Sequence, residues 1–178
     1  LEAVAFYLED TNNPRFLQME ENYESKIKSL LDFIQEENDP SSVENFDIKD
    51  YKEVLRYRTD KGESILSLCV CHHKNRLIEK LLTEFESLFV LEDLLDDETI
   101  EGNTLLLEAF KHNNHDAISI FLDMFILNCT SYELETYLNK QNSAKRTIGH
   151  HLSDESGLLQ KIGKFIDWSI KDATGKTP

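Results

Sequence analysis

The sequence predicts an all-α protein built from repeated, irregular pairs of helices. Apolar residues recur at helical spacing in 24–36 and again in 76–86, whereas signals for strands are nearly absent. Turn-forming residues separate the helical runs, and two of these turns share the pattern Gly-x-Ser/Thr, at Gly62 and at Gly102. A row of helices divided by similar turns indicates a repeat protein.

The composition is that of an acidic protein with enough apolar residues, 40%, to form a hydrophobic core. The 178 residues include 19 Lys and Arg against 34 Asp and Glu, so the formal net charge is −15. Residues 1–50 carry 13 acids and 4 bases. This balance excludes a nonspecific nucleic-acid binder or a reader of anionic membranes. The acidic segment is explained either by a solvated helical face or by a docking surface for a basic partner.

The cysteines and the apolar stretches favour a cytoplasmic protein. Cys69, Cys71 and Cys129 are an odd number without the spacing of a disulfide framework, which favours a reducing compartment. The most apolar stretch, 117–127, is interrupted by Ser119 and Asp123 and is too short to cross a bilayer. The chain starts without Met and stops within a repeated motif, so we expect it to be part of a longer protein.

The N-terminal part is expected to precede or cap the repeats. An amphipathic segment at 1–8 and a break at 12–14 predict that 1–20 is the tail of a preceding domain, or a capping helix and linker. A helix from about Glu21 to Glu37 would shield the first repeat, because terminal repeats need a polar outer face. Divergent repeats are expected over 21–178, with the last one truncated at 178.

Aligning the turns reveals the repeat. The aligned Ser or Thr positions are 64, 104, 147 and 177, with spacings of 40, 43 and 30 residues. Segments 60–70 and 100–110 match well and are each followed by a second apolar helix. A third, degenerate copy starts near 144, and a fourth starts at 172. Gly permits the positive φ of a hairpin tip, and Ser or Thr caps the helix that follows.

These residues resemble the ankyrin repeat, with its pattern D-x-x-G-x-T-P-L-H-x-A-A. The ending Asp172-Ala173-Thr174-Gly175-Lys176-Thr177-Pro178 fits this pattern best. The usual Pro is replaced by Ile65, Leu105 and Ile148, and the usual His by Ser67 and Leu107, so that His150 alone keeps it. HEAT or armadillo repeats, with a period of about 40 to 47 residues, are the alternative. The C-terminal motif favours an ankyrin-repeat solenoid with an N-terminal helical cap.

The segment 1–8 is also similar to the last helix of vacuolar-sorting-type exchange domains, which activate early-endosomal Rab GTPases. Such a tail followed by irregular ankyrin repeats resembles the VARP-like endosomal Rab-exchange factors and their fungal relatives. The resemblance implies a non-catalytic module that docks a sorting-nexin BAR protein, retromer, a SNARE or a Rab on endosomes. The alternatives are an intramolecular domain that restrains a neighbouring exchange domain, or a scaffold in an unrelated complex such as a nuclear one.

The repeat register places a set of residues on the hairpin tips and the inner helices, where a peptide or helix of a partner could bind. The expected partner-binding residues are Lys61, Glu63, Leu68, Cys71, His72, Glu101, Asn103, Glu108, Lys111 and His112. Leu68 would supply apolar contact. Glu63, Glu101 and Glu108 would select for basic residues in the partner.

No motif indicates a metal, a cofactor or catalysis. Cys69, Cys71, His72 and His73 offer metal-binding atoms, but neighbouring helical positions point in different directions, so we expect a buried Cys69 and a partly exposed Cys71 and His72. His112 and His115 are expected to cap a turn. Nucleophile-elbow, P-loop and Rossmann patterns are missing from the sequence, and a hydrolase is the rival class. Trp168 is expected in the core; if exposed, it would be a candidate anchor.

Overall fold

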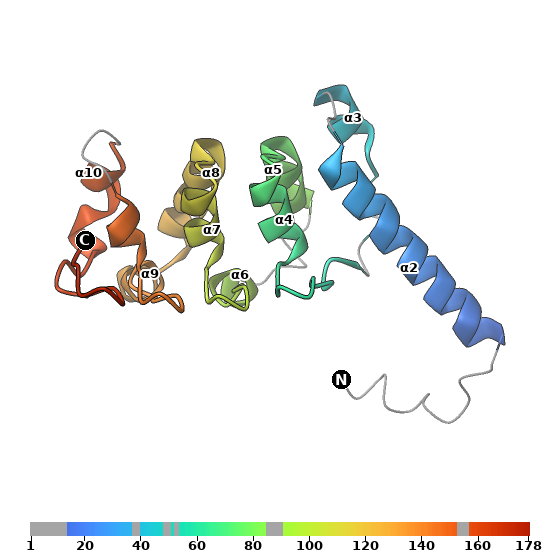
Figure 1. The fold of residues 1–178 in the computed structure, drawn as a ribbon. Coiled ribbons are helices and arrows are strands. Elements are labelled where there is room, and N and C mark those ends of the chain that lie inside the picture. The colour runs from blue at the N-terminus through green and yellow to red at the C-terminus, as the bar shows by residue number, and fades with distance from the viewer. Residues whose placement is uncertain (1–13, 37–39, 48–50, 52–53, 85–90, 153–156) are drawn as a thin grey trace. The chain divides into compact units, whose positions relative to one another are not determined.

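The computed structural model describes residues 14–36, 40–47, 51, 54–84, 91–152 and 157–178. These residues are mostly helical and include no extended strand, which confirms the all-α prediction for this part of the chain. None of the helices among them has the length and apolar content needed to cross a membrane. The chain forms two compact units, Leu1–Tyr57 and Arg58–Pro178, and each is described by itself (Figure 1).

The first unit contains the long helix α2 (Pro14–Gln35) and the short helix α3 (Pro40–Asn45). Helix α2 begins at Pro14 rather than near Glu21, because proline is well suited to the first turn of a helix, where its missing N–H is not needed. The expected apolar period is confirmed, since Leu30 and Ile34 are buried. The segment 1–8, which carries the resemblance to an exchange domain, lies outside the described residues.

Aromatic stacking holds the first unit together. The rings of Phe33 and Phe46 stack with centroids 4.1 Å apart, and those of Phe46 and Tyr51 with centroids 4.7 Å apart. The hydroxyl of Tyr51 also lies 3.1 Å from that of Ser29 on α2. These contacts join α2 to the residues that follow α3.

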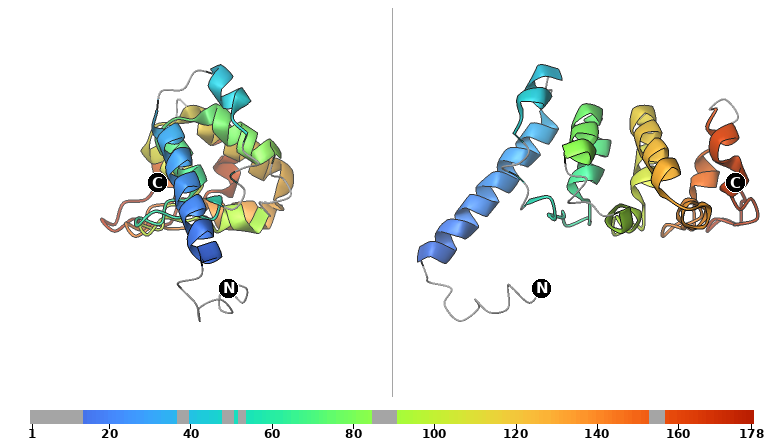
Figure 2. Two further views of the ribbon diagram at one scale, coloured as in Figure 1. Left: turned by 90° about the vertical axis from the view of Figure 1, so that its right-hand side faces the viewer. Right: turned by 180° about the vertical axis from the view of Figure 1, so that it is seen from behind.

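The second unit contains two copies of one helix pair. The first copy pairs α4 (Ile65–Cys71) with α5 (Asn75–Glu84), and the second pairs α7 (Leu105–Lys111) with α8 (His115–Asn128). Each first helix contacts its own second helix, α4 also contacts α7, and α5 contacts α8 (Figures 1 and 2). The two pairs therefore pack side by side, first helix on first helix and second on second.

The two copies are built in the same way at an offset of 40 residues. The Ser64 side chain accepts a hydrogen bond from the Ser67 N–H at 3.0 Å, as Thr104 does from Leu107 at 3.3 Å, so each caps the first helix of its pair. The turn between the helices has a positive φ at His73 (54°) in one copy and at Asn113 (52°) in the other. The local structure thus repeats residue by residue.

Four hairpin tips, 59–63, 99–103, 142–146 and 172–176, precede the aligned Ser and Thr residues. Each tip has one residue of positive φ two positions before that Ser or Thr: Gly62, Gly102, Lys145 and Gly175. Neighbouring tips are joined by backbone hydrogen bonds from Ile100 N–H to the Lys61 carbonyl (2.9 Å), from Ser143 to Glu101 (2.8 Å) and from Ala173 to Ala144 (2.9 Å). The tips therefore form a continuous ladder along the second unit.

Inserted short helices explain the spacings of 40 and 43 residues between the aligned Ser and Thr positions. Short helices α6 (Leu91–Leu95) and α9 (Ser131–Leu138) lie just before the second and third tips. In the third copy the first helix is reduced to the 3₁₀ turn η2 (Ile148–His151). The described chain then continues through α10 (Leu158–Ile162) and the 3₁₀ turn η3 (Gly163–Phe165).

His150 connects the third and fourth tips. Its Nδ1 accepts a hydrogen bond from the Thr147 N–H at 3.1 Å, which places the ring proton of a neutral imidazole on Nε2. Nε2 then donates to the Lys176 carbonyl at 3.2 Å. The one histidine that keeps the repeat pattern therefore has a structural role.

The expectation that Trp168 belongs to the core was wrong. Its side chain is 42% exposed, because it lies in a turn after η3 rather than on a helical face, and its indole N–H donates to the Gly163 carbonyl at 3.3 Å. Cys69 is fully buried, whereas Cys71 is half-buried and His72 exposed, as expected. Among the described residues of the second unit, the largest fully buried side chains are Phe121 and Phe125, on α8.

Candidate functional site

Six of the ten expected binding residues form one connected group of side chains, which we call the inner-face cluster. It consists of Cys71, Glu101, Asn103, Glu108, Lys111 and His112. Helix α4 supplies the first, the second tip supplies the next two, and α7 with the residue that ends it supplies the rest. Residues that are distant in the sequence meet here because α4 packs on α7.

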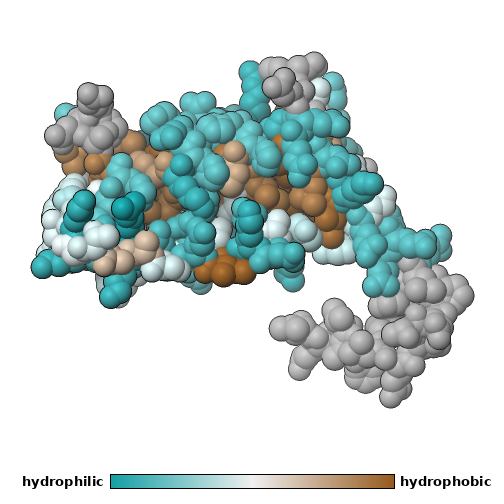
Figure 3. Space-filling view, in the orientation of Figure 1, coloured by the Kyte–Doolittle hydropathy of each residue, from teal (hydrophilic) through white to brown (hydrophobic). Residues whose placement is uncertain are grey.

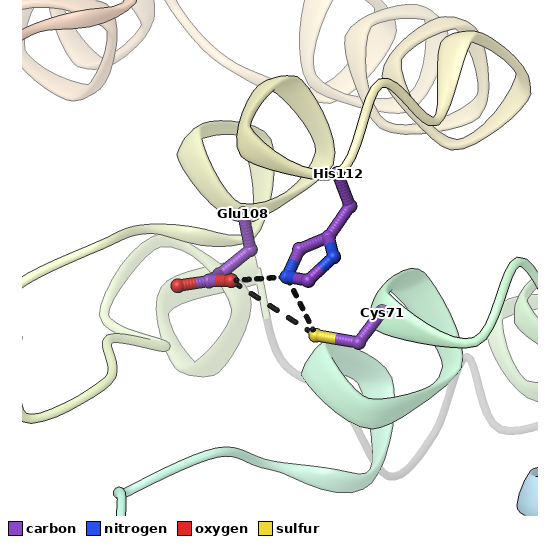
Figure 4. A group of neighbouring side chains, drawn as sticks. All are labelled: Cys71, Glu108 and His112. Atoms are coloured by element: carbon purple, nitrogen blue, oxygen red, sulfur yellow. Dashed lines mark hydrogen bonds and ion pairs between the residues drawn. The ribbon is translucent and has the colours of Figure 1, made fainter.

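Glu108 lies at the centre of the cluster and is only 2% exposed. Its Oε1 accepts hydrogen bonds from Asn103 Nδ2 at 2.7 Å and from Lys111 Nζ at 3.3 Å. Its Oε2 lies 3.3 Å from His112 Nε2 and 3.9 Å from Cys71 Sγ (Figure 4). A buried carboxylate is costly without such partners, so these four groups are what make its burial possible.

The outer part of the cluster is a solvent-facing ion pair. Lys111 Nζ lies 3.1 Å from Glu101 Oε2, and their side chains are 48% and 68% exposed. Partial burial alone would lower the pKa of Lys111, but hydrogen bonds and charge from Glu101 and Glu108 outweigh it and raise that pKa. Lys111 is therefore protonated and pairs with the exposed carboxylate of Glu101 and the buried carboxylate of Glu108.

The cluster also reaches the third tip. Asn103, 4% exposed, accepts a hydrogen bond on Oδ1 from Asn142 Nδ2 at 2.7 Å. Asn142 in turn accepts the N–H groups of Ala144 and Arg146, at 3.0 and 2.9 Å, and so shapes its own tip. Asn103 therefore connects the buried carboxylate to the ladder of tips.

Cys71 and His112 do not form an activated nucleophile, although Sγ and Nε2 are 3.3 Å apart. Burial raises the pKa of the Cys71 thiol to about 11, and the charges of Glu108 and Glu63 add to the effect. In a catalytic triad the acid binds the ring nitrogen that does not face the nucleophile. Here Glu108 and Cys71 both face Nε2, so the carboxylate does not orient the ring toward the thiol.

The remaining expected residues lie on the first tip and α4. Lys61 and His72 are exposed, and Glu63 and Leu68 are half-buried, with Glu63 accepting a hydrogen bond from the Thr59 hydroxyl at 2.9 Å. The burial of Glu108 leaves its carboxylate unavailable for direct contact with a basic partner, contrary to our expectation.

The proximity of Cys71 to His112 was missed at the sequence level. In the sequence, Cys71 lies next to other possible ligands of its own helix, and His112 lies at its own turn, 41 residues away from Cys71. The available signal was the 40-residue offset between copies. This offset aligns Cys71 with Lys111, so it predicts that Cys71 lies next to the end of the neighbouring first helix. The sequence contains no comparable signal for the hydrogen bond between Asn142 and Asn103.

The second unit is therefore defined as an all-α array of helix pairs with joined tips and a polar cluster between two first helices. No family model matches the chain. It is 42% identical over its whole length to a UPF0507 protein of Saccharomyces cerevisiae, and 40% identical over 124 residues to a UPF0507 protein of Kluyveromyces lactis. A UPF0507 protein of Yarrowia lipolytica is 32% identical over 132 residues. The chain spans 24%, 12% and 12% of these relatives, which are all much longer.

Proposed function

We propose that this chain is a non-catalytic docking module of the ankyrin type, which holds a partner protein on its tips and first helices. The observation that carries the proposal is the joined ladder of four tips, each with its residue of positive φ at the same place. An ankyrin repeat combines a turn of this kind with two helices, whereas HEAT and armadillo repeats consist of helices alone. The bridge from His150 to the next tip supports the same assignment.

The surface next to the inner-face cluster combines charge with apolar area. Glu101, Lys61 and His72 are exposed, and Ile100, at the second tip, is 73% exposed. In Figure 3 hydrophilic side chains cover much of the second unit, with apolar residues visible among them. An apolar contact surrounded by charges is typical of a protein interface.

The partner we propose is a basic segment of an endosomal trafficking protein. Residues 51–100 carry 11 acids and 7 bases, and a negative field accelerates the association of a basic partner. The resemblance to VARP-like proteins supports a sorting-nexin BAR protein, retromer, a SNARE or a Rab as the class of partner. The module would then be cytoplasmic and would reach endosomes through that partner.

The test is affinity purification from a fungal lysate with quantitative mass spectrometry, using two charge reversals. Glu101→Lys changes the proposed surface, whereas Glu79→Lys changes an exposed acid on α5. Endosomal trafficking proteins should be recovered with the native chain and with Glu79→Lys, and at least about tenfold less with Glu101→Lys. Equal recovery with both variants would reject this surface, and recovery of nuclear factors alone would reject the endosomal assignment.

A further inference from the structure

We propose that Cys71, Glu108 and His112 form a binding site for a divalent transition-metal ion of the zinc class. The three donor atoms are Cys71 Sγ, Glu108 Oε2 and His112 Nε2, and they lie within 4.8 Å of one another. Figure 4 shows the three side chains converging from α4 and α7. This site is independent of the docking proposal, because it depends only on the geometry of these side chains.

The donor atoms are spaced as such an ion requires. The separations are 3.3 Å between Cys71 Sγ and His112 Nε2, 3.3 Å between His112 Nε2 and Glu108 Oε2, and 3.9 Å between Cys71 Sγ and Glu108 Oε2. Tetrahedral zinc with bonds of about 2.3 Å to sulfur and about 2.0 Å to nitrogen and oxygen has donors separated by about 3.3 to 3.6 Å. The triangle therefore matches one face of a zinc tetrahedron within a few tenths of an ångström.

The chemistry of the donors selects the class of ion. A thiolate and an imidazole bind zinc, cobalt or iron well, whereas magnesium and calcium require sites made of oxygen atoms. On binding, the Cys71 thiol would lose its proton to solvent, and the metal–sulfur bond would replace the contacts that Sγ now makes. The thiolate and the Glu108 carboxylate together would neutralise the two charges of the ion.

The surroundings prepare Glu108 for this role. Asn103 and Lys111 both bind Oε1, at 2.7 and 3.3 Å, which leaves Oε2 directed toward the other two donors. Hydrogen bonds of this kind commonly orient metal ligands. The His112 side chain is 34% exposed, so an ion held by three protein ligands can take its fourth ligand from solvent.

The first copy serves as an internal comparison. At the offset of 40 residues, Leu68 occupies the position of Glu108, and leucine cannot bind a metal ion. The site therefore belongs to the junction of the two copies and is not a general property of the repeat. Asn103 should act as a positioning residue, since it binds Oε1 of Glu108 and none of the three donor atoms.

The test is a titration of the purified 178-residue chain, freed of metal with a chelator, with Co²⁺ and then with Zn²⁺ in competition. A sulfur-to-cobalt charge-transfer band should grow to one equivalent and disappear as zinc displaces cobalt. Cys71→Ser should abolish the band, and His112→Gln should weaken binding by about tenfold or more. Cys129→Ser is the matched control, because Cys129 is also half-buried, and it should leave the titration unchanged.

Circular dichroism would verify that each variant is folded, and the two ligand variants provide separate readouts if one is not. The absence of a band from the folded native chain would overturn the proposal and leave the three residues as a hydrogen-bonded cluster only. A band that survives in Cys71→Ser, or that is lost in Cys129→Ser, would also overturn it. Asn103→Ala should weaken cobalt binding while keeping the band.

Discussion

The two well-formed copies have the same backbone conformation and differ in the side chains at their inner positions. The caps, the residues of positive φ and the hairpin tips recur at an offset of 40 residues. The inner positions do not: Glu63, Leu68 and Cys71 in the first copy correspond to Asn103, Glu108 and Lys111 in the second. Turn and capping positions therefore maintain the repeat, while the inner positions are free to carry a site.

The difference also changes how each copy is stabilised. Half-buried Leu68 gains from removing apolar surface from water, which needs no particular partner. Buried Glu108 depends instead on specific donors, so the second copy should be the more sensitive to single substitutions.

The largest effect should come from removing the buried carboxylate. Glu108→Ala should lower the free energy of unfolding by about 3 kcal/mol, because Asn103 and Lys111 lose their shared acceptor. The corresponding Leu68→Ala should cost about 1 kcal/mol, since that side chain is only half-buried. Urea unfolding in the presence of a chelator would measure both. An equal or larger loss for Leu68→Ala would contradict the contrast between the copies.

The next effect concerns the tips. Gly62 has a φ of 75°, and a Cβ added there would lie 2.9 Å from the backbone nitrogen of Ile100, which bonds the first tip to the second. Gly62→Ala should therefore cost about 2 kcal/mol, from left-handed strain together with the clash.

Gly175→Ala is the matched control for this substitution. Its φ is 83°, but nothing lies within 4 Å of an added Cβ. It should cost about 1 kcal/mol, from backbone strain alone. Thermal unfolding of the two variants would compare them, and losses of the same size would show that the contact between tips does not contribute.

The caps should behave alike in the two copies. Ser64→Ala and Thr104→Ala each remove the side chain that accepts a hydrogen bond from the first turn, and each should cost about 1 kcal/mol. Exchanging the residues, as Ser64→Thr and Thr104→Ser, should be nearly neutral. Urea unfolding that finds one cap neutral and the other costly would break the equivalence of the copies.

The smallest expected effect is a pH dependence of the stability that Asp172 contributes at the fourth tip. A hydrogen bond from the Thr174 hydroxyl lowers the pKa of Asp172 to about 2, with the backbone N–H groups of Lys176 and Thr174 and the charge of Arg146 adding to it, although burial opposes the shift. A carboxyl with a depressed pKa stabilises the fold above its unfolded value of about 3.9, and that contribution is lost as the pH falls toward 2.

Asp172→Asn should therefore be less stable than the native chain at pH 7, and the difference should shrink between pH 4 and about 2. Asn142 occupies the same place in the third tip without an ionisable group, so the cost of Asn142→Ala should stay constant over that range. Unfolding by urea at several pH values would measure both. A difference for Asp172→Asn that does not change with pH would contradict the assignment.

The sequence was sufficient for the features that depend on local backbone requirements. Gly62, Gly102 and Gly175 all have a positive φ, as predicted for hairpin tips, and Ser64 and Thr104 cap the helices that follow them. These residues act through bonds to near neighbours in the chain, so a pattern in the sequence is enough to identify them.

The features that the sequence did not predict depend on contacts between copies or on the backbone path of a single segment. Lys145 takes the positive φ that glycine has in the other tips, and the length of the inserted helices could not be read from a period. The inner-face cluster needs α4 packed on α7, and Trp168 is exposed because its segment leaves the helix. None of these features is encoded by the spacing of residues within one segment.

The most direct test of docking through the tips and first helices is hydrogen–deuterium exchange of the chain, alone and bound to the partner recovered by affinity purification. Exchange should slow on binding in peptides that cover the tips at 59–63 and 99–103 and the ends of α4 and α7. It should stay unchanged in α5 and α8. Protection confined to α5 and α8, with the tips unaffected, would contradict the account.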